Sequence, residues 1–301
     1  MRYYSLNDYC KKTFGEKVYK LSLNAGMTCP NRDGSLSYTG CFYCSEGGSG
    51  DFASDSSLPI AAQLSEARRR LSSKTDCRKF IAYFQAFTNT YAPVEYLEKI
   101  FYEAISDPSV CVLSIGTRTD CFNDEIYDLL SRLNNIKPVW IELGLQSIHQ
   151  STLDAMNTHT KVSDFTVVCN ELNKRSIKVI AHLILGLPGE TKEMMLESVD
   201  FAAKSNIFGI KLQLLHVLRN TKLAELYEKD PFPLFSLEEY CDFIVDCIER
   251  LPPGMVIHRM TGDGPRKLLI APMWSTDKKR VLNTINQNLI KRNTYQGRFF
   301  M

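Results

Sequence analysis

Residues 110–147 read VCVLSIGTRTDCFNDEIYDLLSRLNNIKPVWIELGLQS, and this stretch contains the repeating unit of the fold. Two apolar runs, 110–118 and 138–147, lie on either side of a helical stretch around 124–135. Short apolar runs separated by a helix of this length predict a β-α-β unit with parallel strands. Both runs are apolar almost throughout, which is typical of strands that are buried on both faces of a sheet.

The same alternation continues on both sides of this unit. We expect further strands at residues 18–24, 79–87, 177–189 and 209–218. Six strands separated by helices favour an α/β fold, a partial (β/α)6 TIM-like barrel, over two separate domains. The interpretation is a barrel over residues 1–218 and a C-terminal extension over 219–301, with helices at 236–251 and 278–292 and one more strand between them.

Polar and glycine-rich segments follow the expected strands. They are Gln85 and Asn89, GTRTDC (116–121), LQS (145–147), GLPGE (186–190) and His216. The carboxyl ends of the strands share one face of a parallel barrel, and that face carries the active site. We therefore expect these segments to surround one pocket.

Composition limits the class of protein. The chain has 301 residues, 44% of them apolar and 23% charged, with no apolar run of membrane-spanning length and no signal-peptide core, so we expect a cytoplasmic protein. Net charge is only +2, but residues 266–301 hold eight Lys or Arg against one acid, which makes this tail +7 and the remainder −5. Such asymmetry indicates a polyanionic partner, although a solvated basic helix explains it equally well.

Three cysteines lie in the loop after the first expected strand, CPNRDGSLSYTGCFYC (29–44). A structural zinc site needs a fourth Cys or His, yet the first histidine is His149 and no second CxxC motif exists. A thioredoxin-like redox pair does not use a third thiolate. Three thiolates suit an iron–sulfur cluster in which one iron keeps an open coordination position.

At this point the sequence resembles a known family. Cys29, Cys41 and Cys44, with the segments YFQAFTNTYAP, GTRTDC, WIELGLQS, HLILGLPGE, LQLLHVL and TGDGPRKLLIAPMWS, are similar to the radical S-adenosylmethionine (SAM) superfamily. More narrowly, the chain resembles the YhcC/YtqA-like subfamily, related to the Elp3 radical SAM domain. The spacing of eleven residues between Cys29 and Cys41 departs from the usual three. The resemblance implies a [4Fe-4S] cluster whose fourth iron is chelated by SAM, and reductive cleavage of SAM to a 5′-deoxyadenosyl radical.

The resemblance also implies roles for individual residues. The metal ligands are Cys29, Cys41 and Cys44, and the expected SAM-binding residues are Tyr43, Gly47, Gly48, Gln85, Thr88, Asn89, Glu142, Gln146, Gly186, Pro188 and Gly189. The expected catalytic residues are Arg118, Asp120 and Cys121, and the expected substrate contacts are His216, Arg259, Asp263, Arg266 and Trp274. Three alternatives stay open: Glu142 in a salt bridge with Arg118, Cys121 as a core residue, and Trp274 in a seam between helices and barrel.

The implied reaction is modification of a tRNA wobble uridine. The side chain would be converted from carboxymethylaminomethyl to aminomethyl, with tRNA and an electron donor such as flavodoxin or ferredoxin as partners and no membrane involved. One alternative is a radical SAM enzyme that acts on a small metabolite or on a protein. Another is a zinc-stabilised module that binds nucleic acid.

Overall fold

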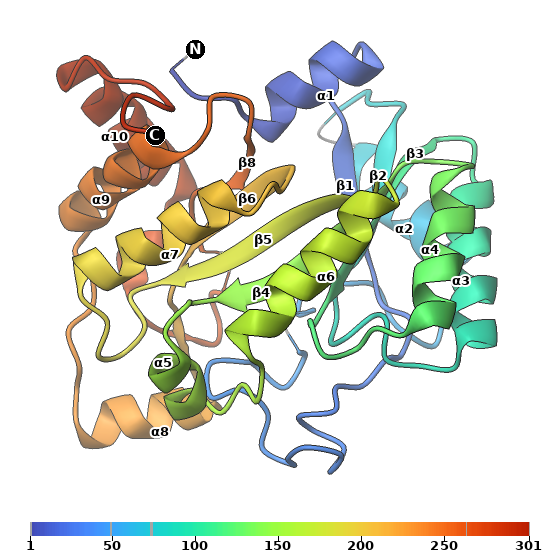
Figure 1. The fold of residues 1–301 in the computed structure, drawn as a ribbon, viewed down its shortest axis with the longest axis horizontal. Coiled ribbons are helices and arrows are strands. Elements are labelled where there is room, and N and C mark those ends of the chain that lie inside the picture. The colour runs from blue at the N-terminus through green and yellow to red at the C-terminus, as the bar shows by residue number, and fades with distance from the viewer. Residues whose placement is uncertain (1, 49, 73–74, 263, 301) are drawn as a thin grey trace.

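A seven-stranded parallel sheet curls through the centre of the structure (Figure 1). The structure is a computed structural model that describes residues 2–48, 50–72, 75–262 and 264–300. The strands are β1 (Tyr19–Leu23), β2 (Phe80–Phe84), β3 (Val110–Thr117), β4 (Val139–Gln146), β5 (Lys178–Leu185), β6 (Gly209–Leu214) and β8 (Val256–Arg259), paired in that order. Because every pair of neighbouring strands is parallel, all carboxyl ends meet at one edge.

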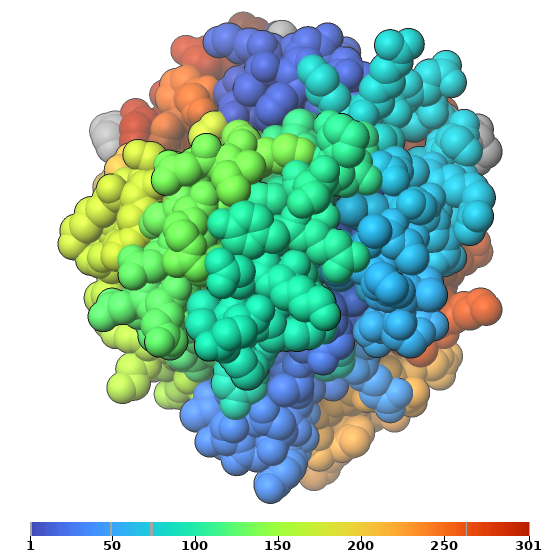
Figure 2. Space-filling model, turned by 90° about the vertical axis from the view of Figure 1, so that its right-hand side faces the viewer, coloured from blue at the N-terminus to red at the C-terminus, as the bar shows by residue number. Residues whose placement is uncertain are grey.

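Helices connect the strands and cover the outer face of the sheet. They are α2 (Ile60–Ser72), α3 (Val94–Ser106), α4 (Asp124–Asn134), α6 (Val162–Lys174), α7 (Lys192–Lys204) and α9 (Leu237–Arg250). Figure 2 shows the side of the molecule that is covered by α2, α3 and α4. The sheet and its helices thus form a curled α/β half-barrel, which confirms the predicted fold class.

The predicted helix at 124–135 shows why the sequence forms these elements. Asn123 caps α4, since its side-chain oxygen accepts a hydrogen bond from the Ile126 backbone N–H at 2.9 Å. Leu129, Leu130 and Leu133 are fully buried against the sheet, while the acidic residues of the first turn lie at the positive end of the helix dipole. Truncating one such leucine to alanine costs about 2–5 kcal/mol of stability.

Several expected strands end earlier than the sequence pattern indicates: β2, expected over 79–87, stops at Phe84, and two others follow. β5 stops at Leu185, because Gly186 turns the chain with a φ of +94°. The run at 209–218 splits: β6 ends at Leu214, and β7 (Val217–Leu218) turns away to pair antiparallel with β9 (Leu269–Ala271). The additional strand that was expected between the two C-terminal helices is present as β8, paired with β6.

The remaining elements close the two ends of the half-barrel. At one end lies α1 (Leu6–Phe14), which starts at a capping box on Ser5 and was not predicted from the sequence. At the carboxyl-end edge lie α5 (Gln150–Ala155) and α8 (Lys222–Lys229), next to the cysteine loop (Figure 1). A short 3-10 turn (Met273–Thr276) leads into α10 (Lys278–Lys291), which packs on α9.

Apolar side chains form a main core between the sheet and the outer helices, and a smaller core under the cysteine loop. The smaller core contains Met156, Leu187, Leu215 and Leu223, with Phe42 and Tyr43 packed against it. In the part of the chain that the structure describes, no helix combines the length and the apolar character that a membrane crossing requires.

Candidate active site

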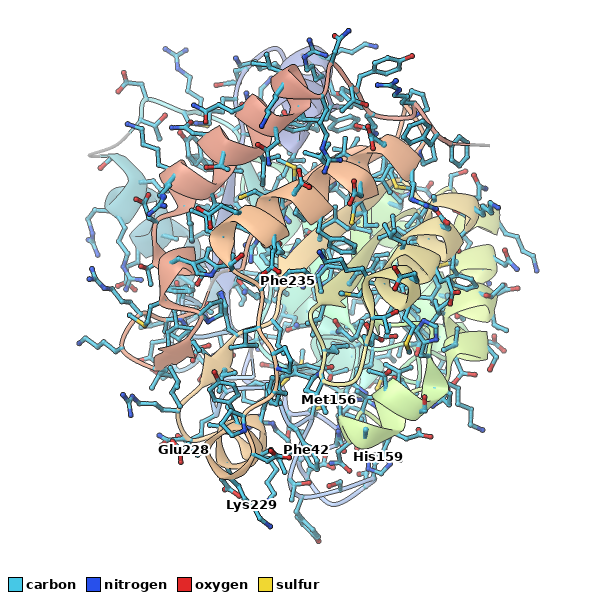
Figure 3. The ribbon with its side chains drawn as sticks, turned by 90° about the vertical axis from the view of Figure 1, so that its left-hand side faces the viewer. Phe42, Met156, His159, Glu228, Lys229 and Phe235 are labelled. Carbon is cyan, nitrogen blue, oxygen red and sulfur yellow. The ribbon has the colours of Figure 1, made fainter. Side chains whose placement is uncertain are left out.

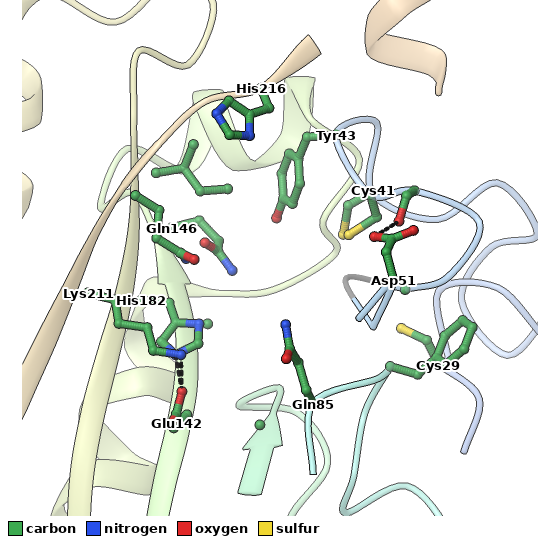
Figure 4. Close-up of a pocket in the computed structure, with 18 of the residues that line it drawn as sticks. Cys29, Cys41, Tyr43, Asp51, Gln85, Glu142, Gln146, His182, Lys211 and His216 are labelled. Carbon is green, nitrogen blue, oxygen red and sulfur yellow. Dashed lines mark hydrogen bonds and ion pairs between the residues drawn. The ribbon is translucent and has the colours of Figure 1, made fainter. Parts of the chain in front are cut away.

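A cavity of about 260 Å³ lies where the carboxyl ends of the strands meet the cysteine loop (Figure 4). It is lined by twelve of the residues that were singled out in the sequence: Cys29, Cys41, Tyr43, Cys44, Gly48, Gln85, Thr88, Arg118, Glu142, Gln146, His216 and Arg259. These residues are spread along the sequence from Cys29 to Arg259. The expectation that strand-end segments surround one pocket is therefore met for most of them.

The cysteine loop (residues 29–44) is fixed by side chains that the sequence did not single out. The Arg32 guanidinium donates hydrogen bonds to the carbonyl oxygens of Cys44 at 3.1 Å and Ser45 at 2.6 Å. The Asn31 amide donates to the Asn157 carbonyl at 2.6 Å and to the Cys41 sulfur at 3.4 Å. Because a charged donor binds two successive carbonyls, the backbone around Cys44 is held in a single arrangement.

The same loop is attached to α5 and α8. The Phe42 backbone N–H donates to the Met156 carbonyl at 3.0 Å, and the Phe42 carbonyl accepts from Leu223 N–H at 2.9 Å. Figure 3 shows Phe42 beside Met156 at this end of the molecule, with Glu228 and Lys229 of α8 nearby. The C-terminal part of the chain thus supports the loop that carries the cysteines.

Cys41 of this loop differs from the buried core cysteines in its pKa. A hydrogen bond from Cys44, helped by the Arg118 charge against the opposing effect of burial, lowers the pKa of Cys41 to about 6. By contrast, burial raises the pKa of Cys10 and Cys169 to about 12. The thiolate is the form that binds metal, so Cys41 is prepared as a ligand at neutral pH.

The donor set fits a cluster better than a single ion. Three sulfurs line one cavity, and Figure 4 shows the Cys41 and Cys29 side chains at its edge on the loop side. Among the described residues, no three His, Cys, Asp or Glu side chains converge as ligands of one metal ion. Thiolates spread around a common space are the ligands that an iron–sulfur cluster uses.

Arg118, Asp120 and Cys121 do not all face the cavity. Arg118 lines it, but the guanidinium already donates two hydrogen bonds to the Asp120 carboxylate, at 2.8 and 2.6 Å. Asp120 and Cys121 line a separate shallow hollow beside Thr90, and burial raises the pKa of the Cys121 thiol far above its ordinary value. Cys121 is therefore placed as a core residue would be, which is the alternative that the sequence left open.

A charged network forms the floor of the cavity, and Glu142 of β4 is at its centre. The fully buried Glu142 carboxylate forms ion pairs with Lys20 of β1 and Lys211 of β6. It also accepts hydrogen bonds from Ser114 of β3 at 2.7 Å and His182 of β5 at 2.8 Å. The salt bridge considered from the sequence exists, but the expected partner was wrong, since Arg118 is bound to Asp120.

The pKa values on this floor follow from burial and charge. Burial alone would raise the pKa of Glu142, but Lys20, Lys211 and His182 hold it well below its ordinary value. Burial, followed by repulsion from Lys211, lowers the pKa of His182 to about 4, although Glu142 acts in the opposite direction. At neutral pH the floor therefore holds an ionised carboxylate and a neutral imidazole that donates its N–H to it.

Gln146 lines the cavity and carries a side-chain oxygen that lacks a hydrogen-bond donor among the described residues. Its side-chain Oε1 is buried, and no described residue donates a hydrogen bond to it. Its backbone has a φ of +64° at an irregularity in the pairing of β4 with β5, which turns the side chain toward the cavity (Figure 4). A buried acceptor without a donor is costly, so this position is suited to a ligand hydroxyl or ammonium group.

The other expected SAM-binding residues divide into two groups. Gly48 lines the cavity, and a Cβ there would lie 2.4 Å from the Phe87 ring, so the close packing of the loop requires glycine. Asn89 does not line the cavity, and its amide donates to the Phe84 and Gly116 carbonyls at 3.2 and 2.9 Å. Gly47, Gly186, Pro188 and Gly189 do not line the cavity either.

The expected substrate contacts are similarly divided. His216 and Arg259 line the cavity, and Gly262 and Gly264 pack so closely on the His216 ring that a Cβ would lie within 2.2 and 2.5 Å of it. Arg266 is exposed and outside the lining, and Asp263 lies outside the described residues. Trp274 donates to the Phe235 carbonyl at 3.0 Å and packs on Tyr240, in the seam between helices and barrel.

Sequence reasoning missed several residues of the cavity. Lys211 and Thr160 line it, and Lys20 and Ser114 complete the floor beneath it. A lysine inside the apolar run GIKLQLL (209–215) was the available signal, because a buried lysine needs a partner. Arg32 gave no such signal, since it lies in a polar loop.

Comparison with known proteins places this architecture in a class. The model of the radical SAM superfamily matches residues 28–202, and the model of the radical SAM C-terminal domain matches residues 207–291. The first model alone covers more than half of the chain. The chain therefore belongs to the radical SAM superfamily, a class of enzymes.

Relatives narrow the assignment to the YhcC/YtqA-like subfamily. The uncharacterized protein YtqA of Bacillus subtilis is 42% identical over 299 residues, which cover 99% of this chain and 93% of YtqA. YhcC of Escherichia coli is 33% identical over 89% of this chain and 85% of its own length. These identities span nearly the whole chain, beyond the cysteine loop.

More distant likenesses extend to the Elongator family. The tRNA uridine(34) acetyltransferase of Methanocaldococcus jannaschii is 26% identical over 53% of this chain and 30% of its own length. The solved structure of Elp3 from Methanocaldococcus infernus superposes with a TM-score of 0.70 at 17% identity, covering 93% of this chain and 64% of that one. At that identity the structural likeness confirms the fold.

Proposed function

We propose that this radical SAM enzyme modifies the wobble uridine of tRNA, converting a carboxymethylaminomethyl side chain to aminomethyl. The observation that carries the proposal is the shared cavity, in which three cysteines, the unpartnered Gln146 oxygen and a charged floor face one another. The cluster, SAM and the side chain of one extruded base would meet in this cavity. Enzymes that act on a base take it out of the stack into a pocket of this kind.

The residues of the chain would divide the work of binding. Cys29, Cys41 and Cys44 would hold a [4Fe-4S] cluster, and its fourth iron would be left for SAM. When bound, this pair supplies a 5′-deoxyadenosyl radical, which abstracts hydrogen. Gln146 would accept a hydrogen bond from a SAM hydroxyl or ammonium group, and Tyr43, half-buried beside the cysteines, would shield them from water.

Two further observations support an RNA substrate. The relative with 26% identity carries tRNA uridine(34) in its name, which refers to the wobble position. The basic tail of this chain, residues 266–301, supplies the positive charge that binds phosphates. An anticodon loop presents unstacked bases, and these are what proteins recognise in single-stranded RNA.

Mass spectrometry of tRNA nucleosides from a deletion strain tests the proposal. We expect carboxymethylaminomethyl-uridine derivatives to accumulate and aminomethyl derivatives to disappear. A plasmid copy of the wild-type chain should restore the profile, and a Cys41→Ala copy should not. An unchanged profile in the deletion strain would remove tRNA as the substrate and leave the family assignment untouched.

A further inference from the structure

The eleven residues between Cys29 and Cys41 are held by Asn157, which comes from the chain that follows α5. The Asn157 side-chain amide donates to the Gly40 carbonyl at 2.9 Å and to the Thr39 hydroxyl at 3.0 Å. Its backbone has a φ of +54°, a left-handed conformation that asparagine adopts more readily than most residues. The chain that leads into Cys41 is therefore fixed by a side chain that is distant in sequence.

Asn31 completes this arrangement from inside the cysteine loop. The side chain is fully buried, and its Nδ2 donates to the Asn157 backbone carbonyl at 2.6 Å. The same Nδ2 donates to the Cys41 sulfur at 3.4 Å. One amide group thus connects an expected metal ligand to the segment after α5.

The orientation of the Asn31 amide follows from its two neighbours. Both are acceptors, since one is a carbonyl oxygen and the other is a sulfur that binds metal as a thiolate, so only the NH2 group can face them. The Asn31 Oδ1 is buried on the other side, and no described residue donates a hydrogen bond to it. The two N–H bonds are kept although the oxygen is left unsatisfied, which is typical of a position with a function.

We propose that Asn31 is a positioning residue that raises the reduction potential of the cluster through its N–H···S hydrogen bond to Cys41. Reduction by one electron adds negative charge to the thiolate ligands, and a donor beside one of these sulfurs stabilises that charge. Hydrogen bonds to the sulfurs are among the factors that set the potential of an iron–sulfur cluster. The inference goes beyond the proposed function, because it holds whichever substrate the enzyme modifies.

An anaerobic redox titration of the cluster-loaded chain with dithionite, followed by electron paramagnetic resonance, tests the proposal. Asn31→Leu keeps the size of the side chain and removes the donor. We expect the equilibrium constant for reduction to fall about two- to fivefold, which lowers the midpoint potential by about 20–40 mV at 59 mV per tenfold change. Asn31→Asp, which puts a carboxylate beside the sulfur, should lower it further. The exposed control Asn283→Leu on α10 should leave it unchanged.

Asn157→Gly separates the hydrogen bond to sulfur from the support of the loop. Glycine adopts the same left-handed backbone and keeps the carbonyl that Asn31 binds, but the donors to Gly40 and Thr39 are lost. This variant should lose iron to a chelator faster than wild type and keep the wild-type midpoint potential. Equal potential shifts in Asn157→Gly and Asn31→Leu would mean that Asn31 only holds the loop, and the proposal would be overturned. A wild-type potential in Asn31→Leu would overturn it as well.

Pulsed electron paramagnetic resonance of the wild-type chain tests the bond without a substitution. Asparagine that carries 15N in its side-chain amide labels Nδ2 and leaves the backbone nitrogens unlabelled. The reduced cluster should show a 15N coupling, which Asn157→Gly should retain and Asn31→Leu should abolish. If the labelled wild type shows no such coupling, the proposal is wrong, even where the Asn31 variants fail to bind a cluster.

Discussion

Gln146 occupies a left-handed backbone conformation that few residues besides glycine, asparagine and aspartate adopt, with a φ of +64°. Such strain, of order 1–3 kcal/mol, is found where the surroundings and a function require it. The buried Oε1 adds the cost of an acceptor that no described residue satisfies. Backbone strain and an unsatisfied buried acceptor thus occur at the same residue of the cavity, and this combination is expected where a residue binds a ligand.

Replacing Gln146 with leucine separates binding from stability. We expect the Kd for SAM to rise about tenfold, because one hydrogen bond to the ligand is lost, while the Tm stays the same or increases. Equilibrium dialysis with labelled SAM and a thermal melt measure the two effects. Gln287→Leu on the exposed face of α10 is the matched control. A lower Tm with unchanged SAM affinity would make Gln146 a structural residue.

His182 predicts how stability changes with pH. Burial lowers its pKa from 6.5 to about 4, so the unfolded chain binds more protons than the folded chain between these values. The wild type should therefore lose stability as pH falls through this window, by at most about 3 kcal/mol relative to His182→Gln. Denaturant unfolding of both proteins at pH 7, 5.5 and 4.5 checks this. A constant difference across the three pH values would contradict it.

At the scale of elements, the cysteine loop depends on contacts that are distant in sequence. Arg32 holds the carbonyls of Cys44 and Ser45, and Met156 and Leu223 pair with the backbone of Phe42. These contacts attach the cysteine loop to α5 and α8 and hold its backbone in place. Its shape, which the cysteine spacing alone does not explain, is the reason that all three sulfurs line one cavity.

Arg32→Met should loosen the cysteine loop, by removing the hydrogen bonds to the Cys44 and Ser45 carbonyls, without unfolding the protein. We expect iron to be lost to a ferrous chelator several times faster than from wild type, because the Cys44 backbone loses its charged donor. The Tm should change by only a few degrees, since Arg32 is half-buried in a loop and takes no part in the main core. Arg70→Met, which removes an exposed ion pair with Glu66 on α2, is the control. Equal rates of iron loss in all three proteins would contradict the role of Arg32.

The sequence was sufficient to predict the sheet, because its strands are local apolar runs separated by amphipathic helices. It also predicted that the three cysteines and most of the strand-end segments line one cavity, since parallel strands bring their carboxyl ends together, although Asn89 and residues 186–190 lie outside the lining. It did not predict the partners of Glu142. Lys20 and Lys211 are far from Glu142 in the sequence, and only the curling of the sheet brings β1 and β6 toward β4.

At the scale of the whole molecule, charge is distributed unevenly, but part of the basic tail is already compensated. Arg292 pairs with Asp242 and Asp246 of α9 at 2.5 Å, whereas Arg280 lies 3.8 Å from Glu238 and both of those side chains remain largely exposed. The two ends of α10 also have different neighbours. The start of α10 follows the segment whose Gly262 and Gly264 line the cavity, whereas Thr294, beyond its end, binds Arg2 at 2.9 Å.

The start of α10 is therefore the part of the tail that we expect to bind RNA. Changing Lys278, Lys279 and Arg280 to glutamine should weaken tRNA binding about tenfold at 0.1 M salt and lower the salt slope by about two. Filter binding at several salt concentrations measures both. The control changes Lys11 and Lys12 of α1 and Lys17, which follows it. Equal losses in the two triple variants would indicate nonspecific attraction.

Electron paramagnetic resonance of the anaerobic, reduced protein, with and without SAM, tests the central claim most directly. The account predicts about four iron atoms per chain and a cluster signal that changes when SAM is added. The iron and the cluster signal should both be lost in Cys29→Ala, Cys41→Ala and Cys44→Ala. A protein that holds zinc without iron, or a cluster signal that ignores SAM, would contradict it.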